Sequence, residues 1–537
     1  MRGLRPFVAL VALAVLLGLT GSALARPNVV VVLTDDQRWD TLSTMPNVTN
    51  RLVRRGVDFR NAFASNPLCC PSRVSILTGR YAHSTGVLSN RPPHGGFVSF
   101  RDGVTIATRL RAAGYRTAYM GKYLNGYANS TYVPPGWDRW LAFANAGYYD
   151  YRLNVDGRLE TGPTVRSVYS TDRLANEAVR FVRESRRPFF LMLAPYAPHE
   201  PAEPARRHAR SFGNLVPWRS PGYRERDVSD KPAWVRARPR NLGFGPQGFR
   251  RRQLQTLLAV DEMVGRVVRA LREEGSLRNT IVVFTSDNGY LWGEHRLSAK
   301  AKPYEESIRV PLVVRYDALT QGRPLAVERL VANVDLAPTL AAAAGAHLPA
   351  AEGRSLLPFL AGRSPRWRSA LLLESLAARG QAVPTWCAVR TRDSVLVAYR
   401  TGERELYDLA GDPYQLRSLH DDPAWNPTEQ ALGARLGRLC NPPPPGLSRS
   451  LLCTHRGGAG PDELVGSRGY DILCGRGGPD SLTPGAGPDW VYAGAGKDSV
   501  RARDGRRDHV DCGAGRDVAW VDALDLVGET CEIVRRA

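Results

Sequence analysis

Two pairs of polar residues stand directly after segments that have the pattern of buried β-strands. Asp35-Asp36 follows the β-branched run 29–33, and Asp287-Asn288 follows the apolar run 281–284. A single aspartate in such a place is often a helix cap or a turn residue, whereas a pair after a buried strand is harder to explain by local structure. Because ligands gather outside the carboxyl ends of strands in α/β sheets, we expect the two pairs to meet.

Lysine is rare in this chain, which has 73 basic residues and a formal net charge of +21. The charge favours a polyanionic partner, but a general bias toward arginine explains it equally well. Where arginine is the default, a retained lysine indicates a place that needs a compact point charge and not a planar guanidinium group. The five lysines are Lys122, Lys231, Lys300, Lys302 and Lys497.

A cysteine pair lies in Leu68-Cys69-Cys70-Pro71-Ser72-Arg73, followed closely by Leu77-Thr78-Gly79-Arg80. On local grounds this is a loop cysteine pair ahead of a helix that begins at Pro71, a residue suited to a first helical turn. The pattern C-x-P-S-R running into L-T-G-R also resembles the signature of type I sulfatases. In that family the cysteine corresponding to Cys69, and not Cys70, is oxidised by a formylglycine-generating enzyme. The hydrate of the resulting aldehyde, formylglycine, is the nucleophile.

The resemblance covers about residues 27–440, and its motifs follow in the family's order. The chain looks most similar to N-acetylglucosamine-6-sulfatases and extracellular heparan endosulfatases, which share the segments found here at 27–37, 69–73, 121–125 and 134–137. The resemblance implies an α/β, alkaline-phosphatase-like sandwich with a small C-terminal α+β subdomain. The alternation of helical and strand patterns favours the same class. Helical patterns cover 105–113 and 251–274, and further strand-like runs cover 189–193 and 312–314.

The resemblance also implies which residues form the site. One divalent cation would be held by Asp35, Asp36, Asp287, Asn288 and an oxygen of the modified Cys69. Oxygen ligands suit Ca²⁺ or Mg²⁺ better than Zn²⁺. Arg73 would stabilise the formylglycine and the cation, and Lys122 and Lys300 would bind sulfate oxygens. His199, between two prolines, would donate a proton to the leaving alcohol.

Two assignments within the motifs require a choice. Lys300 stands four residues before Tyr304, the spacing that the family uses, so we take Lys300 as the sulfate ligand and Lys302 as a solvated surface charge. Many sulfatases have a histidine two residues after the lysine corresponding to Lys122, where it is the base for sulfate release. This chain has Leu124 there, and the candidates for the base are His295 and Asn125.

The N-terminus has the pattern of a secretory signal peptide: Arg2 and Arg5, an apolar run over 7–19, and the A-x-A cleavage pattern of Ala23-Leu24-Ala25. No later stretch is long and apolar enough to predict a membrane span. Export permits disulfides among the six late cysteines, although sequence alone does not fix their pairing. We predict Cys387–Cys440, Cys453–Cys474 and Cys512–Cys531.

Beyond Asn441-Pro442, aspartates recur at a spacing of nine residues, once ten, each preceded by glycines. They are Asp462, Asp471, Asp480, Asp489, Asp498, Asp508 and Asp517. The pattern resembles the calcium-binding RTX nonapeptide repeat. It predicts a β-roll whose aspartates bind Ca²⁺ and whose apolar residues two positions later, such as Leu482 and Val491, fill the core. The alternative interpretation, a disordered glycine-rich tail, is less favoured because low-complexity sequence does not keep a strict period.

These patterns together predict a signal peptide (1–25), a catalytic domain (26–365), a C-terminal subdomain (366–440), a stiff proline-rich linker (441–452) and a β-roll (453–537). The predicted protein is a secreted or cell-surface, calcium-dependent sulfatase acting on a sulfated small molecule or polysaccharide, such as N-acetylglucosamine-6-sulfate units. No nucleic-acid partner is expected. The alternatives are a formylglycine-dependent phosphonate or phosphate ester hydrolase and a non-catalytic, calcium-dependent surface binding protein.

Overall fold

The computed structural model describes residues 26–160, 168–241, 245–377 and 382–537. The signal segment expected over 1–25 lies outside the described residues. Within the described part of the chain, no helix is both long enough and apolar enough to cross a bilayer.

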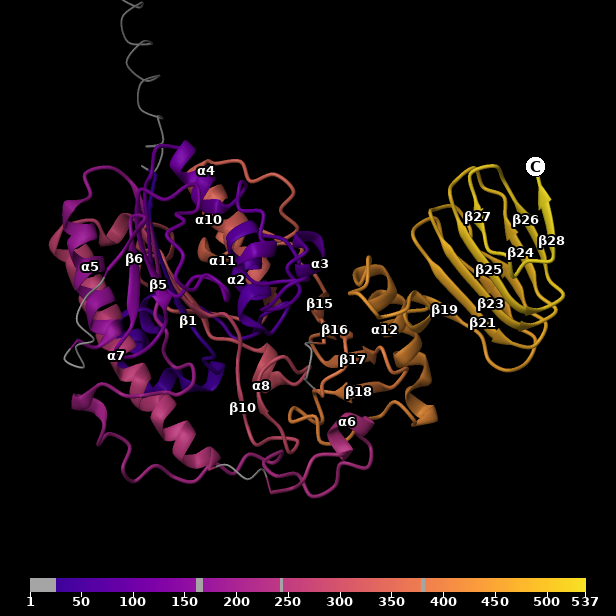
Figure 1. The fold of residues 1–537 in the computed structure, drawn as a ribbon, viewed down its shortest axis with the longest axis horizontal. Coiled ribbons are helices and arrows are strands. Elements are labelled where there is room, and N and C mark those ends of the chain that lie inside the picture. The colour runs from indigo at the N-terminus through magenta and orange to yellow at the C-terminus, as the bar shows by residue number, and fades with distance from the viewer. Residues whose placement is uncertain (1–25, 161–167, 242–244, 378–381) are drawn as a thin grey trace, which may run out of the picture.

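A large mixed sheet forms the centre of the N-terminal part of the molecule (Figure 1). Its middle strand, β1 (Asn28–Thr34), lies parallel to β8 (Phe189–Ala194) on one side and to β9 (Thr280–Ser286) on the other. In order across the sheet the strands are β13 (Leu325–Val327), β2 (Val57–Phe59), β12 (Leu312–Arg315), β9, β1, β8, β4 (Arg116–Gly121), β5 (Arg139–Asn145), β6 (Arg152–Val155) and β7 (Arg158–Leu159). The strands predicted at 29–33, 189–193, 281–284 and 312–314 are confirmed.

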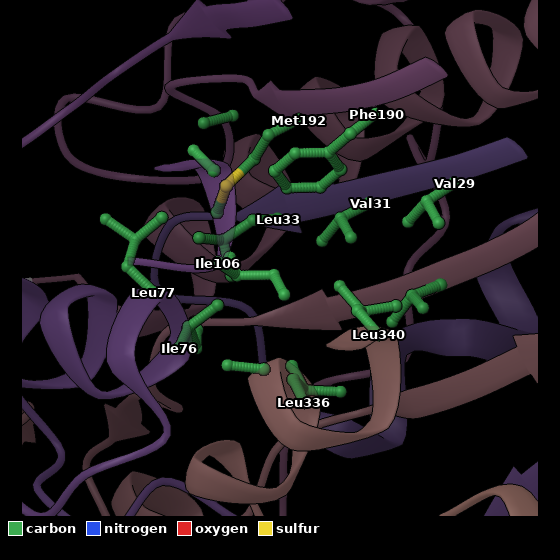
Figure 2. Packing of buried hydrophobic residues seen from close by; sticks show 14 of the residues in the cluster. Val29, Val31, Leu33, Ile76, Leu77, Ile106, Phe190, Met192, Leu336 and Leu340 are labelled. Atoms are coloured by element: carbon green, nitrogen blue, oxygen red, sulfur yellow. The ribbon is translucent and has the colours of Figure 1, made fainter. Parts of the chain in front are cut away.

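Helices cover both faces of this sheet, because β1 buries side chains on both. Val29, Val31 and Leu33 face one helical layer, as Figure 2 shows, and Val30 and Val32 face the other. The first layer contains α2 (Cys69–Thr78), α4 (Ile106–Ala112) and α10 (Leu336–Ala344), and the second contains α1 (Pro46–Arg51), α5 (Ser170–Glu184) and α7 (Pro246–Glu273). Each such side chain contributes about 1.5–3 kcal/mol through burial. The predicted α/β sandwich is confirmed.

A second, antiparallel sheet follows in the chain. It consists of β15 (Ala370–Ser375), β16 (Trp386–Thr391), β17 (Ser394–Tyr399) and β18 (Arg404–Asp408), and α12 (Asn426–Leu439) packs on one face. The predicted disulfide Cys387–Cys440 joins β16 to the end of α12. The segment 441–452 is not the free, stiff spacer that its prolines suggest, because Leu447 and Leu452 are buried in the same apolar cluster as α12.

The C-terminal part is a roll of two parallel five-stranded sheets (Figure 1). One sheet contains β19 (His455–Arg456), β21 (Ile472–Gly477), β23 (Trp490–Gly496), β25 (His509–Gly515) and β27 (Leu526–Val527). The other contains β20 (Glu463–Val465), β22 (Ser481–Thr483), β24 (Ser499–Ala502), β26 (Val518–Val521) and β28 (Ile533–Arg536). Successive strands alternate between the sheets, and Leu482 and Val491 are buried between them as predicted. The disulfides Cys453–Cys474 and Cys512–Cys531 are also confirmed.

Candidate active site

The two acidic strand ends meet. Thr34 at the end of β1 lies opposite Ser286 at the end of β9, so the residues that follow both strands share one edge of the sheet. The amide of Asp36 donates to Oδ1 of Asp287 at 3.1 Å, and Nδ2 of Asn288 donates to Oδ1 of Asp36 at 2.7 Å. All four side chains are buried. The sequence prediction about these pairs is therefore correct.

Cys69 is the first residue of α2, and its thiol faces the acidic cluster. The helix begins two residues before Pro71, so the predicted start is wrong. Proline is tolerated there because its missing N–H would have no intrahelical partner in the first turn. Cys69 Sγ lies 3.6 Å from Oδ1 of Asp35. Cys70 points elsewhere, since its thiol accepts a hydrogen bond from the amide of Asn125 at 3.0 Å.

Two lysine ammonium groups flank the thiol of Cys69. Nζ of Lys300 lies 2.9 Å and Nζ of Lys122 lies 3.6 Å from Sγ. Lys122 directly follows β4, and Lys300 lies between β11 (Ser298–Ala299) and α8 (Glu305–Ile308). Lys122 also pairs with Asp35, and Lys300 pairs with Asp36. Two compact positive charges thus flank the cysteine, in a position where they would stabilise a bound anion.

Arg73 lies one helical turn after Cys69 and connects the parts of the cluster. Its Nε donates to Oδ2 of Asp287 at 2.8 Å, and Nη1 donates to the backbone carbonyl of Lys122 at 2.6 Å. Nη2 lies 3.6 Å from Asp35. The guanidinium group is fully enclosed by these contacts, so it holds β1, β4, β9 and α2 in a fixed relation and does not reach toward solvent.

Burial and charge set the protonation of the cluster. Burial opposes ionisation of Asp35, but the positive charges of Lys122, Arg73 and Lys300 hold its pKa well below the usual range. Burial raises the pKa of the Cys69 thiol to about 11 despite the neighbouring lysines. An unmodified thiol here is therefore protonated at neutral pH and is a poor nucleophile.

The acidic cluster fits a hard divalent cation. Carboxylate oxygens of Asp35, Asp36 and Asp287 all lie within 4.8 Å of one another. Oδ1 of Asn288 is buried at the same place and has no hydrogen-bond partner among the described residues. An orphaned amide oxygen beside three carboxylates costs free energy unless a cation or water satisfies it. Oxygen donors of this kind suit Ca²⁺ or Mg²⁺.

His199 borders the cluster on the loop after β8. Its Nε2 lies 3.8 Å from Asp36, and its Nδ1 lies 2.8 Å from the carbonyl of Glu200. Burial lowers the pKa of this imidazole. Sequence reasoning missed Tyr196, whose ring lies 4.8 Å from the ring of His199 and 5.5 Å from Nζ of Lys122. The signal was an aromatic residue three positions before His199 in the same loop.

The structure does not bring the two candidate bases to the cysteine. His295 is buried with Nδ1 2.8 Å from Glu225, and its ring stacks on Tyr304 at 4.1 Å. Asn125 faces Cys70. The pKa of His295 is raised: burial opposes its protonation, but the hydrogen bond with Glu225 and the charges of Glu306 and Glu225 together outweigh it. His295 therefore has the contacts of a buried ion pair and not those of a group facing substrate.

The reading of Lys302 as a solvated surface charge is wrong. Its side chain is half-buried, and Nζ donates to the carbonyls of Ser298 at 2.6 Å and Lys300 at 2.8 Å. Burial, with the charges of Arg238 and Lys300, lowers its pKa to about 7. Lys302 thus supports the backbone that presents Lys300.

A second set of carboxylates lines the turns of the β-roll. Oδ1 of Asp480, Asp489, Asp498, Asp508 and Asp517 accepts the amide of the aspartate one coil earlier, for example from Asp462 to Asp480 at 2.8 Å. The other oxygen is buried without a partner within the described residues in Asp480, Asp489, Asp498, Asp508 and Asp517. Burial raises the pKa of Asp489 and Asp508 to about 7. Rows of orphaned carboxylate oxygens fit Ca²⁺ between the turns.

Comparison with known protein families gives a match over most of the N-terminal part of the chain. The family model described as sulfatase matches residues 27–346. The chain belongs to the sulfatase family. Two further models match this sulfatase: the N-sulphoglucosamine sulphohydrolase C-terminal model over 293–441, and the RTX calcium-binding nonapeptide repeat in three stretches between 456 and 519.

Individual relatives of this sulfatase match between 66% and 78% of the chain. N-acetylglucosamine-6-sulfatase of Homo sapiens is 36% identical over 396 residues, covering 69% of this chain and 71% of that protein. The extracellular sulfatase SULF-1 homolog of Drosophila melanogaster is 36% identical over 378 residues, which cover 66% of this chain but 34% of that protein. A solved protein in complex with its substrate D-glucosamine-2-N,6-O-disulfate has a TM-score of 0.69 and 26% identity, covering 78% of this chain and 98% of that one.

Proposed function

We propose that this protein hydrolyses sulfate esters through a formylglycine derived from Cys69. The observation that carries the proposal is the position of Cys69 Sγ between Nζ of Lys122 and Nζ of Lys300, beside the acids that follow β1 and β9. Formylglycine supplies, as its hydrate, a hydroxyl nucleophile together with a second hydroxyl that permits release of sulfate. The thiol that the gene encodes offers neither.

The residues around Cys69 would each contribute one function. Lys122 and Lys300 would bind sulfate oxygens and stabilise the charge that develops as the ester bond breaks. Arg73 would position the cluster, because its Nε donates to Asp287 and its Nη1 to the carbonyl of Lys122, while Nη2 faces Asp35. The side chains of Asp35, Asp36, Asp287 and Asn288 would hold Ca²⁺ or Mg²⁺, which supplies Lewis-acid polarisation of an oxygen at the reacting centre.

His199 would give a proton to the leaving alcohol. Its Nδ1 is directed at the carbonyl of Glu200, which leaves Nε2 on the side of the cluster. Burial disfavours the charged imidazole, whereas the sulfate of a bound substrate adds negative charge and favours it. The imidazole is then poised to lose its proton when the ester bond breaks.

Replacing His199 with glutamine should have an effect that depends on the leaving group. For a sugar sulfate, whose alkoxide is a poor leaving group, kcat should fall by about 10²–10⁴-fold, the usual contribution of a general acid. For a nitrophenyl sulfate, which leaves without a proton, the loss should be small. Steady-state rates on both substrates test this assignment, and equal losses on both would show that His199 has another role.

The relatives favour sulfated glucosamine as the substrate class, so we propose 6-O-sulfated N-acetylglucosamine units. The experiment is a panel of glucosamine sulfates assayed with protein that carries the modified cysteine, with phosphodiesters and phosphonate esters in parallel. Sulfate release from the 6-position supports the proposal. Faster turnover of phosphonate esters or phosphodiesters would instead identify the protein as the alternative hydrolase. If no ester were turned over, the remaining interpretation would be a non-catalytic binding protein.

Export of the protein, its maturation by a formylglycine-generating enzyme and the domain division at 365, 440 and 452 belong to the same proposal. The RTX repeats and the three disulfides support an oxidising, calcium-rich compartment.

Calcium removal should act in two stages. The roll turns are rich in glycine and costly to order without metal, whereas the catalytic acids follow strands of a packed sheet. Mild chelation should therefore abolish the β-structure signal of residues 456–520 in circular dichroism while aryl sulfate hydrolysis continues. Both signals should be followed against free Ca²⁺ concentration. Coincident loss would show that the roll and the catalytic domain are one cooperative unit.

A further inference from the structure

A pocket of about 260 Å³ lies where the roll meets the antiparallel sheet of residues 370–408. Its walls come from α12, from Arg404 at the start of β18, and from β19 and β21, the first strands of one sheet of the roll. Figure 1 shows α12 beside these strands, on the side of the molecule away from α5 and α7. None of its lining residues belongs to the site around Cys69.

The pocket carries an excess of positive charge. Three arginines line it, Arg404, Arg456 and Arg476, against one acid, Glu429. Glu429 is already neutralised, because Nη1 of Arg404 pairs with it at 2.9 Å. Arg456 and Arg476 have no ion pair or hydrogen bond from their side chains within the part of the chain that the structure describes. Two guanidinium groups thus share the pocket without a counterion.

Arg456 is the less exposed of these two arginines. Its Nε atom is buried and has no hydrogen-bond partner among the described residues. Burial, with the charges of Arg404 and Arg476, lowers its pKa to about 9. A buried donor on a charged group is costly to leave unpaired, so such groups in proteins are normally matched by an anion or a bound ligand.

Arg476 has an unfavourable backbone conformation. Its φ is 79°, in the left-handed region, and its register partners in the next two strands of the same sheet are Gly494 (φ 111°) and Gly513 (φ 88°). Glycine adopts this conformation without steric cost, whereas a side chain with a β-carbon does not. An arginine at a position where the neighbouring strands have glycine strains the backbone. Such strain is typical of residues that bind a ligand.

We propose that this pocket binds a tetrahedral oxyanion, either the sulfate group of a sulfated saccharide or the free sulfate ion. The planar forks of Arg456 and Arg476 suit bidentate contacts with sulfate oxygens, and the amide of Gln430 adds a neutral polar group to the wall. The bound anion would join the roll to α12. Anion binding does not depend on the proposed hydrolase activity, although a saccharide ligand would fit it.

The test is calorimetric titration of the calcium-loaded full chain with sodium sulfate and, separately, with a sulfated tetrasaccharide. Arg456→Gln should weaken binding at one site at least tenfold for whichever ligand occupies it, while hydrolysis of an aryl sulfate stays at the wild-type rate. Arg516→Gln removes the same charge from an exposed position of the roll and should change neither. Binding of sodium sulfate at this site identifies the free ion as sufficient, and binding of the tetrasaccharide alone identifies a saccharide sulfate.

Arg476→Gly separates binding from folding. It should raise the unfolding temperature of the anion-free, calcium-loaded protein, because strain is relieved, and yet weaken anion binding. Arg468→Gly is the matched control, since Arg468 is exposed and has no left-handed φ, so its loss should not stabilise the protein. Wild-type affinity for both ligands in Arg456→Gln and Arg476→Gly would overturn the proposal.

Discussion

Replacing Cys69 with serine should abolish multiple turnover of sulfate esters, with a loss of about 10⁴-fold or more, as expected when a nucleophile is removed. Serine offers one hydroxyl in place of the two of a hydrated aldehyde, so a sulfated serine has no second hydroxyl through which to release the sulfate. Rates on a nitrophenyl sulfate and the mass of the protein after incubation measure the two consequences.

Cys70→Ser is the matched control for this prediction. Cys70 is the neighbouring buried cysteine, and its sulfur accepts the amide of Asn125, a contact that a serine oxygen can also make. The control should keep turnover within a few-fold of wild type. Equal losses in both variants, with both folded, would contradict the assignment of Cys69.

Lys122→Arg and Lys300→Arg should each lower kcat by about 10²–10³-fold even though the charge is kept, comparable to the loss of one donor to a developing oxyanion. Both ammonium groups lie in a confined space, within 3.6 Å of Cys69 Sγ and paired with Asp35 or Asp36. A guanidinium group is larger and planar, so it would displace either the sulfate or the acids.

Lys497→Arg, on an exposed turn of the roll, is the silent control for the two lysine variants. Lys302→Arg is not a suitable control, because Nζ of Lys302 is held between two backbone carbonyls and a longer side chain would disturb them. Near wild-type kcat in both Lys122→Arg and Lys300→Arg would refute the point-charge argument.

The sheet and the acidic cluster were predictable from sequence for a physical reason. A β-branched run such as 29–33 has few alternatives to a strand buried on both faces, and parallel neighbours place their carboxyl ends together. The position of Asp35 beside Asp287 follows from these two facts. The apolar residue two positions after each repeat aspartate predicted the core of the roll in the same way.

The errors concern residues whose surroundings come from distant segments. Lys302 is enclosed by a turn in which Ala299 and Ala301 both have positive φ, which nothing in the local sequence requires. His295 is paired with Glu225, 70 residues away in sequence, so its burial was not visible. The packing of 441–452 could have been predicted, because Leu447 and Leu452 are too apolar for an exposed spacer.

The most direct test of the central claim is the chemistry of the tryptic peptide 61–73, which contains both Cys69 and Cys70. Protein that hydrolyses sulfate esters should yield this peptide with one alkylatable thiol, at Cys70, and one aldehyde that reacts with a hydrazide, at Cys69. Mass spectrometry with fragmentation locates both groups. An active protein whose peptide carries two alkylatable thiols and no aldehyde would contradict the account.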